Sequence, residues 1–204
     1  MKKLRYTKIS RDSLYLLYVS DKLSMSQIAN KLACSVNKVD YWMRRYDIPR
    51  RTRSEALYAL NNPNGDPFLL KSSMDANDRE LYGIGMGLYW GEGTKASKNS
   101  VRIGNSDPGV ILIFMRFLEQ IYNVKKDVLR FGMQLFTDCD TERALDYWCN
   151  KLSVNRSQFY KIHVTISGRI GTYRKKNEYG VVTLYFHNTR LQKMLVDQIN
   201  NMPR

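Results

Sequence analysis

The sequence predicts two domains, a small all-α domain followed by an α+β domain in which strands are covered by helices. Three observations support this prediction. Apolar residues recur at helical spacing between Ser10 and Ser54. Helix-breaking dipeptides then cluster over a short stretch. After them, helical periodicity alternates with the period-two pattern that is typical of strands.

The composition describes a folded, strongly basic protein. The 204 residues include 33 Lys and Arg against 19 Asp and Glu, a net charge of +14, and 43% of the residues are apolar. This balance favours a polyanionic partner, with nucleic acid before a membrane surface. Cys34, Cys139 and Cys149 have no CxxC spacing, which predicts neither a disulfide framework nor a zinc site. We expect a soluble protein of a reducing cytoplasm, associated with the nucleoid, because no apolar run is long enough for a membrane span.

Three short helices with a tight turn near Ala33 to Ser35 are predicted between Ser10 and Ser54. Ser24 is a candidate N-cap for the second helix. The side chains expected to face inward share helical spacing and are Leu14, Leu17, Tyr18, Ile28, Ala29, Leu32, Val36, Val39 and Met43.

The residues "IANKL", a short turn and "VDYW" resemble the helix-turn-helix domains of resolvases and small regulators. That resemblance implies that the third helix lies in the major groove of DNA. The DNA-contacting residues would be Ser35, Asn37, Lys38, Tyr41, Arg44 and Arg45 on this helix, with Arg50, Arg51 and Arg53 after it. Between Met1 and Glu55 there are 13 basic and 5 acidic residues. The basic segments at the two ends of this stretch, "MKKLRYTK" and "RRTR", are therefore candidate phosphate contacts. The alternative is that these side chains only solvate a helix face.

Asn-Pro, Asn-Gly and Asp-Pro occur within seven residues after Leu60. They predict a linker over 61–78, a first domain over 1–60 and a second over 79–204.

The second domain begins with a helix that is unusually rich in glycine, "DRELYGIGMGLYWGEG". Gly83, Gly87 and Gly91 recur every four residues, so they line one face of the helix. A glycine in a helix costs up to about 1 kcal/mol relative to alanine. Close approach of a second helix backbone to this face would offset that cost.

The stretch "MGLYWGEG", Met86 to Gly93, resembles the LAGLIDADG motif of homing endonucleases in its Gly-Glu-Gly variant, with Tyr89 and Trp90 replacing the usual isoleucine and aspartate. In that family two copies of the helix pack at a twofold or pseudo-twofold axis, and the terminal acid of each binds a divalent metal at the scissile phosphates. The resemblance implies that Gly83, Gly87 and Gly91 form a dimer interface. It also implies that Glu92, with the adjacent Gly91, binds Mg2+ or Mn2+.

The remaining elements are predicted from their patterns. Strands are expected over 100–107, 127–138, 158–167 and 180–188, and helices from Pro108 to about Ile121, over 141–152 and over 191–199. One strand face is apolar and is expected to pack under the helices: Leu129, Phe131, Met133, Leu135, Ile162, Val164, Ile166, Val182, Leu184 and Phe186.

The opposite strand face carries hydrogen-bonding and basic side chains, namely Arg130, Gln134, Lys161, His163, Thr165, Thr183, Tyr185 and His187. The resemblance implies that a curved antiparallel saddle lays this face into the major groove of DNA. A loop carrying Arg169, Arg174, Lys175 and Lys176 would extend the contact along the backbone. The alternative is an ordinary solvated sheet face.

One motif per chain supplies one acid, so the resemblance implies a metal-dependent, site-specific double-stranded DNA endonuclease that acts as a homodimer. Gln134 and Lys161 are the further catalytic candidates, with Lys95 as a basic neighbour. Two alternatives stay open: a transcriptional regulator that binds DNA on the same scaffold without cutting it, and an RNA-binding splicing factor. The sequence contains no P-loop, GxSxG or HNH motif.

Overall fold

The computed structural model describes residues 8–166 and 177–202. The chain divides into two compact units, Met1–Asp66 and Pro67–Arg204, each with an apolar core of its own. Residues 67–78, at the end of the stretch predicted as a linker, belong to the second unit.

The first unit is a cluster of short helices. Helix α1 (Arg11–Tyr15) continues into a π-helical turn (Leu16–Ser20), and α2 (Met25–Lys31) and α3 (Val36–Arg45) follow. A left-handed residue, Ala33, forms the tight turn between α2 and α3, as the sequence predicts. The capping box that joins Ser24 and Gln27 starts α2.

The core of this unit contains seven of the nine side chains predicted to face inward, Leu14, Leu17, Tyr18, Ile28, Ala29, Val39 and Met43. Leu32 is only partly buried. The prediction was wrong for Val36, which is exposed because it is the first residue of α3. Helix α4 (Arg53–Asn61) starts at a capping box between Thr52 and Glu55 and has no buried residue.

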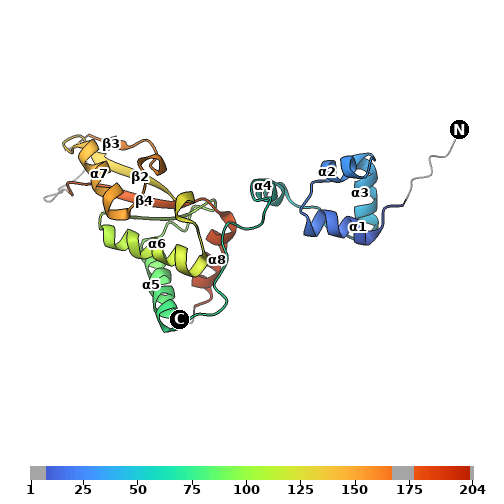
Figure 1. Ribbon diagram of the computed structural model, residues 1–204, viewed down its shortest axis with the longest axis horizontal. Helices are drawn as coiled ribbons and strands as arrows, with labels where there is room; N and C mark the ends of the chain where they lie inside the picture. The colour runs from blue at the N-terminus through green and yellow to red at the C-terminus, as the bar shows by residue number, and fades with distance from the viewer. Residues whose placement is uncertain (1–7, 167–176, 203–204) are drawn as a thin grey trace. The chain divides into compact units, whose positions relative to one another are not determined.

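Over residues 67–166 and 177–202, the second unit contains four long helices and four strands. Figure 1 shows α5 (Ala76–Glu92) and α6 (Pro108–Tyr122) on one side of the sheet. The remaining helices are α7 (Thr141–Leu152) and α8 (Thr189–Asn200), with short 3-10 turns at Lys126–Val128 and Arg156–Gln158. The strands are β1 (Val101–Asn105), β2 (Arg130–Phe136), β3 (His163–Thr165) and β4 (Val181–Phe186). The helices predicted in this unit are thus confirmed.

The sheet has the order β1-β4-β2-β3 and is mixed. Strand β4 runs antiparallel to both β1 and β2, but β3 runs parallel to β2. The prediction of a fully antiparallel sheet was therefore wrong. The reason is that α7 connects β2 to β3 as a crossover, which returns the chain to the same end of the sheet.

One face of the sheet packs against the helices in a single apolar core. It contains Leu129, Phe131, Met133, Leu135, Val182, Leu184 and Phe186, as predicted. The prediction was wrong for Val164 in β3, which is 45% exposed, and for Ile166 just after β3, which is 56% exposed. Ile162, just before β3, is partly buried against the core. Strand β3 is a three-residue strand at the edge of the sheet, so it has a neighbouring strand on one side only.

Candidate nucleic-acid interface

The face of the sheet that points away from the helices, here called the open face, carries the predicted polar residues in ordered rows. Arg102, Tyr185 and Arg130 lie side by side across β1, β4 and β2. Gln134 lies beside His163, and its amide is 3.4 Å from the hydroxyl of Thr165. Side chains on one face of adjacent strands are close enough to act as one surface.

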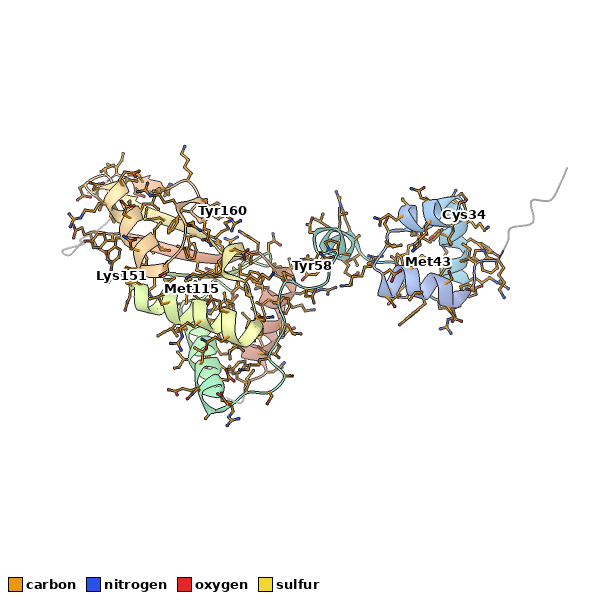
Figure 2. The ribbon with its side chains drawn as sticks, viewed as in Figure 1. Cys34, Met43, Tyr58, Met115, Lys151 and Tyr160 are labelled. Atoms are coloured by element: carbon orange, nitrogen blue, oxygen red, sulfur yellow. The ribbon has the colours of Figure 1, made fainter. Side chains whose placement is uncertain are left out.

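An aromatic cluster on the open face lies between two arginines. The Tyr160 hydroxyl is 2.6 Å from Nε2 of His187, and the ring of His187 stacks on Tyr185 at 5.8 Å. The guanidinium of Arg102 lies 5.2 Å from the Tyr185 ring centroid. Tyr160 lies on the opposite side of the sheet from Met115 of α6 (Figure 2). This cluster, Tyr160, Tyr185, His187 and Arg102, offers flat rings and hydrogen-bonding atoms beside positive charge.

Glycine makes room for this arrangement. A Cβ atom on Gly132 would lie 3.1 Å from Cε2 of Tyr185, tighter than an ordinary contact, so the tyrosine ring lies directly over the glycine. Arg102 and Tyr160 were not predicted as interface residues. Arg102 alternates with buried Val101 and Ile103, which is the pattern that identifies the open face. Tyr160 precedes β3, and its contacts with His187 and Tyr185 place it on this face.

His187 provides a prediction on pH. Burial, followed by the charges of Arg102 and Arg130, lowers the pKa of His187 below its usual value of about 6.5. The folded state therefore favours neutral His187, so this residue's contribution to stability is present above pH 6.5 and is lost as pH falls through the lowered pKa. We expect an NMR titration of the full chain to show a His187 midpoint below 6.5, and Arg102→Met to raise it. A midpoint at or above 6.5 would contradict the charge arrangement.

Glu92 is the last residue of α5, and its side chain is exposed. The chain then passes along the outer edge of β1, where Gly93 bridges to Ile103 and the Thr94 N–H donates to the Arg102 carbonyl at 3.0 Å. The Lys95 ammonium donates to the Trp90 carbonyl at 2.5 Å, so it compensates a free carbonyl at the end of the helix.

Gln134 and Lys161 do not lie next to Glu92 within one chain. Gly93 adjoins β1, and Gln134 lies beyond β4 on β2, three strand spacings across the sheet and three residues farther along the strand, or ~17 Å away. Lys161 lies two residues before the start of β3, which is one strand farther across the sheet. Within the described ranges, 8–166 and 177–202, no group of three or more His, Cys, Asp or Glu side chains is arranged to hold a metal ion.

The glycine face of α5 is open. A Cβ atom added to Gly83, Gly87 or Gly91 would meet no atom within 4 Å. Two large apolar side chains on the same side of the helix are also exposed, Ile84 at 44% and Trp90 at 58%. The opposite side is tightly packed, because a Cβ atom on Gly85 would lie 2.2 Å from Cγ of Phe117 in α6. Gly85, which was not singled out in the sequence, therefore allows the contact between α5 and α6.

In the first unit, α3 exposes most of the predicted DNA-contacting side chains. Asn37, Lys38 and Tyr41 line a hollow of about 580 Å³ together with Ser35 and Trp42. The Ser35 hydroxyl accepts a hydrogen bond from the Lys38 N–H at 3.3 Å, so Ser35 caps α3.

The carboxylate of Asp40 orients the basic residues of this surface. It pairs with Arg44 at 2.6 Å and also with Arg50, which follows α3. Arg45, at the end of α3, and Arg53, in the first turn of α4, are exposed. Because Arg44 remains largely exposed in its ion pair, its guanidinium is accessible to a phosphate or a base.

Arg51 is half-buried, and its guanidinium binds the backbone of the first unit. Its guanidinium donates to the carbonyls of Tyr18 at 3.2 Å, Lys22 at 2.8 Å and Leu23, and it lies 4.2 Å from the Tyr18 ring centroid. The structure therefore favours Arg51 as a clamp between the end of α3 and the π-helical turn, where sequence reasoning predicted a DNA contact.

Arg51→Ala is expected to lower the local unfolding free energy of the first unit by about 2 kcal/mol, because it removes hydrogen bonds from a charged donor. Hydrogen exchange of the α2 and α3 amides in the full chain would measure this change. Arg53→Ala, at an exposed position two residues later, is the matched control and should leave exchange unchanged. Equal exchange rates in the two variants would contradict the clamp.

Four predicted DNA contacts, Arg169, Arg174, Lys175 and Lys176, lie outside the described residues. Across the described part of the chain, no helix combines the length and apolar character of a membrane span. Comparison of the chain with family models, curated proteins and solved structures finds no match.

Proposed function

We propose that the protein is a site-specific, divalent-metal-dependent endonuclease of homing type that cuts double-stranded DNA as a homodimer. The observation that carries this proposal is the open glycine face of α5, which ends at the exposed carboxylate of Glu92. A helix whose exposed side is lined by glycine and by large apolar residues has the properties of an interface between helices.

A second copy of the chain is the partner that the proposal requires. Packing of α5 against α5 about a twofold axis would cover Ile84 and Trp90 of both chains and allow the backbones to approach at Gly83, Gly87 and Gly91. If the twofold axis runs along the helices, so that the two copies are parallel, the same packing would bring both Glu92 carboxylates together near the axis, since each terminates its helix.

The carboxylates of Glu92 from the two chains would hold the metal, with the Gly91 backbone beside each. One exposed carboxylate per chain fits Mg2+, which takes one or two carboxylates together with substrate phosphates and water. The bound metal would polarise the scissile phosphate and lower the pKa of a water molecule. The protein itself must hold the duplex so that the scissile phosphates lie at the axis.

Duplex binding is assigned to the open face and to α3. The open face carries Arg102, Arg130, Gln134 and the aromatic cluster, and the net charge of +14 supplies attraction to phosphates at long range. We assign Gln134 and Lys161 to DNA contact and not to the chemical step, because strands β1 and β4 separate them from Glu92. Residues of α3 and Arg50 would contact a second, outer site as a helix-turn-helix surface.

The test begins with a pool of randomised duplex DNA. The full chain is used to select bound duplexes without metal, and the selected duplexes are then incubated with protein and Mg2+ or Mn2+. The proposal expects cuts in both strands at one position within the protected region, and none without a divalent cation. Selected duplexes that stay intact with either metal would contradict nuclease activity.

The second candidate is a DNA-binding regulator on the same scaffold. It is favoured by the isolation of Glu92 from other ligand side chains within the described part of one chain. Tight selection of one duplex sequence, without metal-dependent cutting, is the result that this candidate predicts. Preference for folded RNA over every duplex in the pool would exclude both.

A further inference from the structure

The connection between the two units is shortened by a segment that is bound to the second unit. The Leu69 N–H donates to the Tyr122 carbonyl and the Lys71 N–H to the Ile121 carbonyl, both at 2.8 Å. Ile121 and Tyr122 end α6, where carbonyls lack partners within the helix. The extended segment 68–71, here called the docked segment, therefore completes the end of α6.

Side chains hold the docked segment as well. The Phe68 ring packs edge-on against Tyr122 at 6.5 Å. The Lys71 ammonium pairs with the Asp78 carboxylate at 2.6 Å, and Asp78 is a buried residue in the first turn of α5. The segment is thus attached both to the end of α6 and to the start of α5.

The other end of the connection is fixed on the first unit at Arg51. Besides its guanidinium bonds, Arg51 donates its backbone N–H to the Tyr18 hydroxyl at 2.8 Å. Between these two anchored points, Arg51 and Phe68, the chain includes α4, which belongs to the first unit but has no buried residue.

Chain geometry limits how far this connection reaches. Helix α4 has 9 residues and rises about 1.5 Å per residue, and the other residues between Arg51 and Phe68 extend at most ~3.5 Å each. The maximum span is about 40 Å, or the length of ~12 base pairs. If the chain were free as far as Asp75, the N-cap of α5, the span would be about 65 Å.

We propose that the docked segment sets the spacing between the DNA sites contacted by the two units, and that Phe68 and Lys71 are the residues that determine this spacing. The inference rests on the proposed duplex binding by both units. It does not depend on cleavage. A short connection raises the effective concentration of the first unit only at sites within its reach, so an outer site moved farther away loses that gain.

Two variants distinguish the effect of the length of the connection from the effect of the docked segment. Phe68→Ala with Lys71→Ala removes the ring contact with Tyr122 and the ion pair with Asp78, and is expected to release the docked segment. Insertion of twelve Gly and Ser residues between Asn64 and Gly65 lengthens the connection but leaves the docked segment intact, so it remains informative if the first variant unfolds. Protected regions on a selected duplex define an inner and an outer site, and ten base pairs inserted between them move the outer site by one helical turn.

We expect the wild type to lose at least tenfold in affinity on the lengthened duplex, and the Gly/Ser insertion to recover most of this loss. The released variant, if folded, should also recover it. Tolerance of the lengthened duplex by the wild type, within twofold, would overturn the proposal. Persistence of the loss in the Gly/Ser insertion variant would overturn it too.

A measurement without DNA tests the docking itself. Fluorescence energy transfer between dyes at Lys31→Cys and Lys151→Cys, with the three native cysteines replaced by serine, reports the separation of the units in the free chain. The released variant should show a longer mean separation than the wild type. An unchanged separation would overturn the docking even if both proteins bind DNA. Failure of the chain to select any duplex would overturn the proposed function but would not affect the fluorescence result.

Discussion

Replacing Glu92 by glutamine is expected to lower DNA cleavage by about 10³-fold and to leave duplex affinity within about twofold. The factor corresponds to the several kcal/mol of charge stabilisation that a bound metal supplies in the transition state. Glutamine keeps the size of the side chain but removes the charge that would hold the metal. Because Glu92 is exposed at the end of α5, the fold should not change.

A matched control lies on the same helix. Glu80 is also exposed on α5, three turns before Glu92, and Glu80→Gln removes the same charge from the molecule. It should cut DNA like the wild type. Single-turnover cleavage of the selected duplex under saturating protein and Mg2+ measures both variants, and a Glu92→Gln variant that cuts at the wild-type rate would exclude Glu92 as a metal ligand.

Gly87→Leu is expected to convert the dimer into a monomer and so to abolish double-strand cutting. A Cβ atom at Gly87 meets nothing within 4 Å in one chain, so leucine fits the isolated subunit. In the proposed dimer it would separate the two helices by the width of a side chain and pull the Glu92 carboxylates apart. Sedimentation velocity at micromolar concentration measures the change of state.

Alanine substitutions at neighbouring glycines distinguish the interface from the core. Gly85→Ala places a methyl group 2.2 Å from Phe117 and should lower the unfolding free energy by about 1–3 kcal/mol. Gly87→Ala has no such clash in one chain, and the better helix propensity of alanine should stabilise an isolated subunit by up to about 1 kcal/mol. If Gly87→Ala and Gly87→Leu both leave the oligomeric state unchanged, α5 is not the interface.

The sequence predicts much of the fold because its patterns are local. The helical spacing of Ile111, Phe114 and Leu118 is sufficient to place α6. The alternation through Val182, Leu184 and Phe186 likewise identifies β4 and its buried face. The direction of β3 relative to β2 is not set by a local pattern. It depends on α7, which crosses between the two strands, and side chains alternate in parallel and antiparallel strands alike.

In the candidate site, too, the sequence predicts the features that depend on local patterns and misses those that depend on distant contacts. Glu92 and the polar residues of β2 and β4 follow from motif and alternation. The position of Arg51 depends on carbonyls about thirty residues earlier in the chain, which no local pattern reveals. Gly85 and Gly87 are equally small in the sequence, and only the packing of α6 shows that one contacts Phe117 and the other is open.

The central claim, that two copies pack through the glycine face of α5, is tested most directly by disulfide cross-linking. Gly83, Gly87 and Gly91 are changed one at a time to cysteine in a chain whose Cys34, Cys139 and Cys149 are serine. A disulfide needs Cα atoms about 4.4–6.8 Å apart, which only a close backbone contact provides. We predict that at least one variant forms a covalent dimer under mild oxidation, while Lys151→Cys on α7 does not. If none of the three cross-links more than Lys151→Cys, the α5 dimer and the paired Glu92 site are contradicted.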